Sequence, residues 1–204
     1  MIQTLATATM KNLYIGVMSG TSVDAIDIVA VEIFDDSIYF YDAFSFTFET
    51  TLRKEILELS RNSLELSNSE LKLIDKKLAH AYGKAINEFI HISKVNKNDI
   101  VAVGLHGQTI FHQPDAEHPF SLQIGGGQIV SDITKLTIID DFRSADIKAG
   151  GQGAPLAPIF HSFLFGHKEE VRCVVNIGGI ANISVFKGRE VIEGYDIGPG
   201  NVLM

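Results

Sequence analysis

The sequence predicts an α/β protein with one lobe of mixed sheet and helices and the first strands of a second, similar lobe. Three short strand-like segments occur near the N-terminus, and a comparable set occurs over residues 171–195. A long segment with helical apolar spacing lies between the two sets. The composition, 46% hydrophobic and 21% charged, is that of a folded protein rather than a disordered chain.

The first set of strands is expected between residues 13 and 48. Leu13–Met18 is an apolar run that ends in a Ser-Gly-Thr-Ser turn. Ile26–Phe34 is rich in Val and Ile, and Ser37–Phe48 alternates aromatic with smaller or more polar residues. Asp35-Asp36 suits a hairpin turn between these two runs. Short turns between consecutive strands predict an antiparallel meander.

Helices are expected next. Leu52–Ser60 has the length of a short helix, and Ser67 with Glu70 has the spacing of a capping box. After this box, apolar residues recur every three or four positions and define one face of a long helix that packs on the sheet: Leu71, Ile74, Leu78, Tyr82, Ala85, Phe89 and Ile92. Pro155–Phe165 is also expected to be helical, with Pro155 in its first turn.

Further strands are expected at 100–105, 120–124 and 136–139, and then at Val171–Ile177, Ile180–Phe186 and Glu190–Tyr195. Because the last three repeat the opening unit, they suggest duplicated lobes with a cleft between them. No helix follows the second unit, so residues 171–204 are expected to pack poorly alone. The expected division is a disordered leader at 1–12, an N-terminal lobe at 13–165 and the start of a second lobe at 166–204.

Charge and cysteine content exclude several classes of protein. The formal net charge is −8 and no basic block is present, which argues against nucleic-acid and anionic-membrane binding. No apolar run approaches the length of a membrane span. The single cysteine, Cys173, excludes an internal disulfide, and its place in an apolar strand predicts an inert core thiol.

Glycine and small polar residues gather where strands are expected to end, which is where open α/β sheets bind ligands. The Ser-Gly-Thr-Ser turn at 19–22 offers backbone N–H groups and hydroxyls that can cradle a phosphate. Asp24 and Asp27 follow it at positions suited to hold a hydrated Mg²⁺. The alternative is a plain hairpin whose Asp residues make Asx-turns.

Asp196 follows an aromatic residue at a strand end and precedes Gly-Pro-Gly-Asn. This placement suits a general base for water or a hydroxyl, and it equally suits a residue that caps the turn. The sequence contains no GxxxxGK[ST], GxGxxG or GxSxG motif. His106, His112 and His118 are six residues apart, a spacing that matches no common zinc site, and His106 is expected to form hydrogen bonds at a strand end.

Seven segments in this order together resemble the anhydro-N-acetylmuramic acid kinase family, although each alone is unspecific: Gly16–Asp24, Gly104–Thr109, Gln123–Gly125, Asp141–Arg143, Gly150–Leu156, Asn176–Asn182 and Asp196–Asn201. The resemblance implies a two-lobed fold of the actin, sugar-kinase and Hsp70 type, with a ribonuclease-H-like sheet in each lobe. It implies a cytoplasmic bacterial enzyme of peptidoglycan (cell-wall) recycling. Ala25 stands where the family usually has Gly.

The family's reaction uses ATP, Mg²⁺ and water to open the 1,6-anhydro ring of the amino sugar and to phosphorylate O6. Its product is N-acetylmuramic acid 6-phosphate. The partners implied are therefore ATP and a small amino sugar, with neither nucleic acid nor membrane, and the resemblance is compatible with a homodimer.

The resemblance also implies site residues. Asp196 matches the catalytic aspartate, which would activate water to attack the anomeric carbon while the bridge oxygen takes the γ-phosphate. The matched cofactor-binding residues, of which Asp24 and Asp27 are also the expected metal ligands, are Gly20, Thr21, Ser22, Val23, Asp24, Ala25, Ile26, Asp27, Asn176, Gly178 and Gly179. The matched sugar-binding residues are His106, Gln108, Thr109, Gln123, Asp141, Arg143, Gly153 and Pro155.

Two other functions stay open. A non-catalytic, truncated sugar- or nucleotide-binding homologue would keep the same motif residues, because fold and cleft survive the loss of chemistry. Another sugar kinase of the same superfamily is disfavoured by the run Gly-Gly-Gln-Gly-Ala-Pro-Leu at 150–156.

Members of the family continue well beyond the segment that corresponds to Asp196–Asn201, into the part of the second lobe that carries the adenosine. We therefore expect this 204-residue chain alone to be inactive or nearly so. The measurement is transfer of the γ-phosphate of ATP to the anhydro sugar by the isolated chain. Robust ATP-dependent turnover would contradict the expectation.

Overall fold

The computed structural model describes residues 2–4, 12–34, 37–61, 67–113 and 117–200. Its main sheet has the strand order β1-β4-β3-β2-β5-β8. The expected meander is confirmed, because β2 (Leu13–Met18), β3 (Ala25–Phe34) and β4 (Ser37–Thr47) are consecutive antiparallel neighbours. Strands β5 (Ile100–Leu105) and β8 (Ile138–Ile139) extend the sheet in parallel on the other side of β2. This is the ribonuclease-H-like arrangement expected for the first lobe.

Strand β1 (Ile2–Thr4) pairs in parallel with β4. These three residues lie in the segment expected to be a disordered leader, so the structure differs from that expectation at residues 2–4. The reason is the free edge of β4, which offers backbone partners to the start of the chain. Residues 1 and 5–11 of the expected leader lie outside the described residues.

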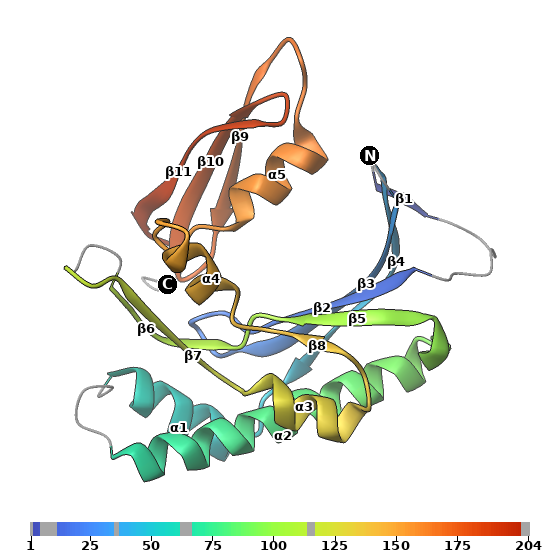
Figure 1. Cartoon of the computed structure of the whole chain (residues 1–204), viewed down its shortest axis with the longest axis vertical. Helices are drawn as coiled ribbons and strands as arrows, with labels where there is room; N and C mark the ends of the chain where they lie inside the picture. Colours follow the sequence, from blue (N-terminus) through green and yellow to red (C-terminus); the bar gives the residue numbers. More distant parts are fainter. Residues whose placement is uncertain (1, 5–11, 35–36, 62–66, 114–116, 201–204) are drawn as a thin grey trace.

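One face of the main sheet is covered by α1 (Thr50–Arg61), α2 (Asn68–Ile92) and α3 (Gly127–Thr134), which lie below the sheet in Figure 1. The predicted apolar stripe of α2 forms the contact, and its residues Leu78, Tyr82 and Phe89 are completely buried. They pack into one core with strand residues such as Ile15 and Ile28. Each such side chain contributes roughly 1.5–3 kcal/mol when it leaves water, so this face holds the fold together.

The capping box at the start of α2 is present as predicted. The hydroxyl of Ser67 accepts a hydrogen bond from the Glu70 N–H at 3.4 Å, and the Glu70 carboxylate accepts one from the Ser67 N–H at 3.0 Å. These bonds satisfy N–H groups that a helix start leaves without partners. No helix among the described residues combines the length and the apolarity that crossing a membrane requires.

Strand β6 (Gln108–Gln113) and helices α3 and α4 (Phe142–Lys148) were also not expected. Strand β6 pairs with β7 (Phe120–Ile124) in a separate two-stranded sheet, whereas the sequence indicated only the end of a strand there. Helix α3 follows β7, and helix α4 follows β8 and contacts β7. Neither helix has a side-chain hydrogen bond at its N-cap, which is Gly126 in α3 and Asp141 in α4. Both helices are also short, with eight and seven residues, so their apolar period is weak.

A three-stranded antiparallel sheet ends the described chain, made of β9 (Val171–Ile177), β10 (Ile180–Lys187) and β11 (Glu190–Pro199). Helix α5 (Ala157–Phe165) packs on β10 and β11, and Phe186 beneath it is completely buried. The expected lack of cover therefore holds for one face only, because a preceding helix covers the other. The division expected between residues 165 and 166 stays a prediction.

The outer face of this second sheet is apolar and exposed. Val175 is 53% and Ile177 is 67% exposed, and Cys173 on the same strand is also exposed. The prediction that Cys173 is a core thiol is therefore wrong. The apolar alternation of β9 does mark a face that favours burial, but among the described residues nothing packs on it.

Removing the cap hydroxyl should destabilise the main core through α2. We expect Ser67→Ala to lower the free energy of unfolding by about 1 kcal/mol, because one N–H at the helix start loses its acceptor. Ser60→Ala is the control, since the Ser60 hydroxyl donates only to the Ile56 carbonyl within α1. Urea denaturation measures both changes, and equal stability of Ser67→Ala and the unsubstituted protein would contradict the role of the cap.

Candidate functional site

The parallel pairing of β2 with β5 brings the first two candidate segments to one edge of the sheet. Val17 is opposite Leu105, and the N–H of His106 donates to the carbonyl of Val17 at 3.1 Å. The turn after β2 and the segment after β5 therefore leave the sheet side by side. Figure 1 shows these strand ends on the side of the molecule that carries α4.

The turn after β2 is fixed from its buried side. The carbonyl of Gly20 accepts hydrogen bonds from the Val23 N–H at 3.0 Å and from Nε2 of Gln108 at 3.1 Å. Val23 has a φ of +52°, a conformation that a β-branched residue rarely adopts, and its side chain is completely buried. Thr21 and Ser22 remain exposed at the tip. The turn therefore offers two hydroxyls and nearby backbone to a ligand.

Asp24 is engaged by α1. Its carboxylate pairs with Nη2 of Arg53 at 3.1 Å, and Nε of the same guanidinium donates to the Val23 carbonyl at 2.8 Å. A hydrogen bond from the Ser22 side chain, followed by one from Arg53, lowers the pKa of the Asp24 carboxyl. Asp24 is thus ionised, but a metal ion there would compete with Arg53.

Asp27 occupies a different environment. It lines a cavity of about 490 Å³ on the sheet face opposite α1 and α2, together with His106 and Phe142, and its carboxylate accepts a hydrogen bond from Ser45 at 2.5 Å. Ile26 beside it is buried in the core, and Ala25 is half-buried.

The side chains near the turn after β2 could bind Mg²⁺ only if phosphate and water supplied most of its ligands. Within the described ranges, no group of three or more His, Cys, Asp and Glu side chains is arranged to hold a metal ion. Mg²⁺ that is bound mainly by phosphate and water needs only one or two protein carboxylates. The carboxylate of Asp27 and the hydroxyls of Thr21 and Ser22 fit that kind of site.

His106 and Arg143, both assigned to the sugar side of the site, contact each other. Nδ1 of His106 lies 2.8 Å from the Gly107 carbonyl, which can only accept, so Nδ1 carries the proton. Nε2 then accepts from Nε of Arg143 at 3.2 Å. Burial, with a smaller contribution from the Arg143 charge, lowers the pKa of His106. A neutral His106 thus orients Arg143, next to an exposed Asp141 with a φ of +55°.

The β6–β7 hairpin carries three further predicted residues. Thr109 and Gln123 are opposite each other and half-buried, and Nε2 of Gln123 donates to the Thr109 hydroxyl at 3.3 Å. Gln108 differs from them, because it is 1% exposed and its side-chain amide bonds inside the protein. Thr109 and Gln123 can reach a ligand, whereas Gln108 cannot.

Two glycine-rich loops have backbone N–H groups that are already bonded to carboxylates. Asp75 accepts from Gly125 at 2.7 Å and from Gly126 at 3.1 Å, and Asp140 accepts from Gly127 at 2.9 Å. In the loop before α5, Asp146 accepts from the N–H of Gly153 at 2.7 Å. Gly153 is buried there, while Pro155 is exposed.

The second sheet carries the remaining predicted residues. Asn182 of β10 is opposite both Asn176 of β9 and Asp196 of β11, so the three form one polar row across the sheet. Asp196 is exposed and makes no side-chain hydrogen bond or ion pair within the described part of the chain. The Gly178-Gly179 turn lies beside the end of β11, where the N–H of Gly200 donates to the Gly179 carbonyl at 2.8 Å.

The predicted residues therefore form two groups. The first surrounds the ends of β2, β5 and β6 with the start of α4, and the second lies on β9–β11 and the Gly178-Gly179 turn. Among the described residues no side-chain hydrogen bond or ion pair joins Asp196 or Asn176 to the first group. In Figure 1 the end of the second sheet where β9 leads into β10 points toward α4.

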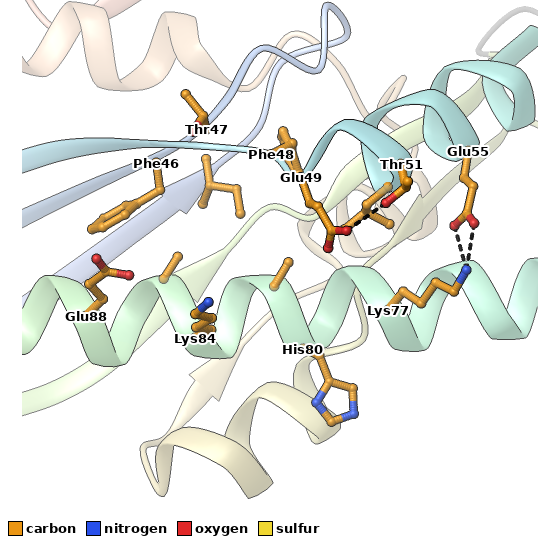
Figure 2. A pocket seen from close by; sticks show the side chains of 14 residues that line it. Phe46, Thr47, Phe48, Glu49, Thr51, Glu55, Lys77, His80, Lys84 and Glu88 are labelled. Carbon is orange, nitrogen blue, oxygen red and sulfur yellow. Dashed lines mark hydrogen bonds and ion pairs between the residues drawn. The ribbon is translucent and has the colours of Figure 1, made fainter.

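A larger cavity, of about 1040 Å³, lies on the helical side of the main sheet. Figure 2 shows it between α1, α2 and the end of β4, with the Lys77–Glu55 ion pair at 2.7 Å across it. Of the predicted site residues only Ile26 lines it. Its size therefore does not mark it as the site to which the sequence motifs point.

Several residues that shape the site were not predicted. Tyr82 was expected only in the core, and Arg53, Asp75 and Asp146 carried no signal, because their partners are distant in sequence or contacted through backbone atoms. Ser19 belongs to the predicted turn, but its inward-facing hydroxyl could not be deduced from spacing.

Comparisons with known proteins agree with these observations. A profile of the anhydro-N-acetylmuramic acid kinase family matches residues 12–204. A solved structure of a reductive activator for a corrinoid, iron–sulfur protein is similar in fold, with a TM-score of 0.50 and 12% identity over 95% of this chain and 32% of that one.

Two further solved structures are more distant. A PPX-GPPA enzyme from Aquifex aeolicus has a TM-score of 0.46 and 14% identity, covering 94% of this chain and 54% of that chain. Ethanolamine utilization protein EutJ from Carboxydothermus hydrogenoformans has a TM-score of 0.39 and 10% identity, covering 98% and 55%. The chain thus spans about half or less of these proteins.

The family profile covers all but the first eleven residues, and it includes every segment that forms the two site groups. The ribonuclease-H-like sheet is the fold that this family was expected to have. The chain belongs to the anhydro-N-acetylmuramic acid kinase family.

Proposed function

We propose that the protein uses ATP, Mg²⁺ and water to open the 1,6-anhydro ring of anhydro-N-acetylmuramic acid and to phosphorylate O6. The product is N-acetylmuramic acid 6-phosphate, and the proposed role is peptidoglycan recycling in the bacterial cytoplasm. The observation that carries the proposal is the family match, which extends over both groups of site residues.

The proposed reaction has a simple balance. Water adds to the anomeric carbon, and the bond from that carbon to the bridge oxygen breaks. The bridge oxygen becomes O6 and takes the γ-phosphoryl group, so ADP leaves. The proton of the attacking water passes to a base, which must lie within hydrogen-bond reach of that water.

Asp196 is the proposed base. Its exposure and its lack of a side-chain partner within the described residues leave both carboxylate oxygens available for water. Asn182 and Asn176 in the same row can orient ligand groups beside it. A general base must come within hydrogen-bond reach of the proton that it takes, and free carboxylate oxygens allow this.

The turn after β2 is the proposed phosphate site. Thr21 would donate to phosphate oxygens, Ser22 would do so on release of its hydrogen bond to Asp24, and Asp27 would help to hold Mg²⁺. When bound, Mg²⁺ offsets the negative charge that develops on the transferring phosphoryl group. We assign Asp24 a supporting role because Arg53 already binds its carboxylate. Asn176, Gly178 and Gly179 are proposed to approach the nucleotide from the second sheet.

The sugar is proposed to lie between the β6–β7 hairpin and α4. Thr109, Gln123 and Asp141 can offer polar groups, with His106, Gly153 and Pro155 in the adjacent segments. Arg143, oriented by neutral His106, is the proposed partner of the lactyl carboxylate, because a guanidinium matches a carboxylate with two parallel hydrogen bonds.

A non-catalytic binding protein is the second candidate, and it is compatible with the fact that Gln108 and Asp24 already bond to other groups of the protein. The two functions differ in whether Asp196 takes part in a reaction.

In the protein as its gene encodes it, we expect Asp196→Asn to lower kcat at least about 100-fold, because the general base is lost. The KM for sugar and the KM for ATP should each change less than about 3-fold, since the shape of the site is kept.

Phosphorus NMR of the sugar phosphate measures this turnover. Glu193→Gln is the matched control, because Glu193 is an exposed carboxylate of the same strand outside the polar row. Its kcat should equal that of the unsubstituted protein. No turnover in the unsubstituted protein, together with unchanged ligand binding in Asp196→Asn, would favour the binding protein instead.

The role of Arg143 is tested by substrate preference. Lysine keeps the charge but lacks the paired geometry of a guanidinium, so we expect Arg143→Lys to lower kcat/KM for the anhydromuramic sugar roughly 10- to 100-fold. Anhydro-N-acetylglucosamine lacks the lactyl group, and its kcat/KM should change less than about 3-fold. An equal loss for both sugars would show that Arg143 does not bind the carboxylate.

A further inference from the structure

A buried hydrogen-bond chain leads from α2 to the turn after β2. The Tyr82 hydroxyl lies 2.5 Å from Oγ of Ser19, and Oγ of Ser19 lies 2.7 Å from Oε1 of Gln108. Nε2 of Gln108 reaches the Gly20 carbonyl at 3.1 Å. Tyr82, Ser19 and Gln108 are 0%, 2% and 1% exposed, so water does not compete for these bonds.

The donor of each hydrogen bond in this series can be deduced from the last group, the Gly20 carbonyl. The Gly20 carbonyl only accepts, so the Gln108 side chain must present its NH₂ group to it and its oxygen to Ser19. Ser19 therefore donates to Gln108, and its one proton is used. Tyr82 must then donate to Ser19. Burial raises the pKa of Tyr82, so this hydroxyl keeps its proton at neutral pH.

The Gly20 carbonyl accepts two hydrogen bonds, and both restrict the turn. It also accepts the N–H of Val23, which closes the turn and holds Val23 at a φ of +52°. A β-branched residue stays in this conformation only when its surroundings impose it. The Gln108 amide supplies such a constraint, since it fixes the acceptor of the closing bond.

We propose that Gln108 is a positioning residue for the phosphate turn and not a sugar ligand. Its oxygen and one N–H are engaged in the chain, and its Nε2 also lies 3.5 Å from the Thr109 carbonyl. It thereby couples Gly20, at the phosphate side, to Thr109, at the sugar side, as one rigid unit. The assignment of these two sides rests on the proposed function.

Tyr82 anchors this unit to the core. Gly125, at a φ of +100°, lies so close to the Tyr82 ring that any side chain there would collide with it. The ring is thus enclosed between α2 and the loop after β7. This packing fixes the hydroxyl that begins the chain, so Tyr82 positions Ser19 and, through it, Gln108.

The test replaces Gln108 by its isosteric acid, Gln108→Glu. A protonated carboxyl group can still donate to the Gly20 carbonyl, whereas a carboxylate can only repel it. Burial raises the pKa of the introduced group, so the native bond should be present near pH 5 and lost as the pH rises toward 8. Gln123→Glu, the same change in the neighbouring strand, is the matched control.

The readout is amide hydrogen exchange at Val23, measured by NMR on the chain without ligands and expressed relative to the unsubstituted protein at the same pH. For Gln108→Glu we expect a ratio near one at about pH 5 and at least about 10-fold faster exchange at about pH 8. For Gln123→Glu the ratio should stay near one at both values. A ratio for Gln108→Glu that does not change with pH would overturn the proposal.

If Gln108→Glu does not fold, Gln108→Met provides the same test without a charge. Methionine has a similar length but no donor, so Val23 should exchange about 10-fold faster at both pH values. Weaker sugar binding with unchanged Val23 exchange would make Gln108 a ligand and overturn the proposal. Hydrogen exchange does not depend on catalysis, so a protein without kinase activity would refute the proposed function and leave this result intact.

Discussion

The parallel pairing of β2 with β5 is the constraint on which the candidate site depends. Because the two strands run in the same direction, the Ser19 turn and the His106 segment leave the sheet at one edge. Ser19 and Gln108 are 89 residues apart in sequence, and this pairing brings them within hydrogen-bond distance. The core secures it, since Ile15 and Val103 on the two strands are completely buried beneath α2.

The regular elements of this core could be predicted because the apolar residues of each follow one period, that of a strand or that of a helix. Leu13–Met18 and Ile100–Leu105 have the predicted bounds, and the stripe of α2 begins at its predicted cap. Helices α3 and α4 could not be predicted, since eight and seven residues are too few to show a clear helical period. The burial of Cys173 was mispredicted for a different reason, because alternation identifies an apolar face but not what covers it.

The candidate site was predictable in position but not in orientation. Glycine and small polar residues mark strand ends, so the segments near Gly20, His106 and Gly125 could be located. Which way Gln108 faces depends on the unpredicted strand β6, where Gln108 shares a buried face with Ile110. Likewise the partner of Asp24 is a guanidinium on α1 that no motif includes. Long-range packing decides such contacts, and a single sequence does not encode it in a local pattern.

The carboxylates of Asp75, Asp140 and Asp146 show that some of the acidic residues have a structural role. Each accepts the N–H groups of a glycine-rich loop, in the manner in which such loops bind a phosphate oxygen. Part of the negative charge of the chain is therefore bound by its own backbone N–H groups. Glycine content alone overstates how many loops of this protein can receive a phosphate, because two of them already bind a carboxylate of their own chain.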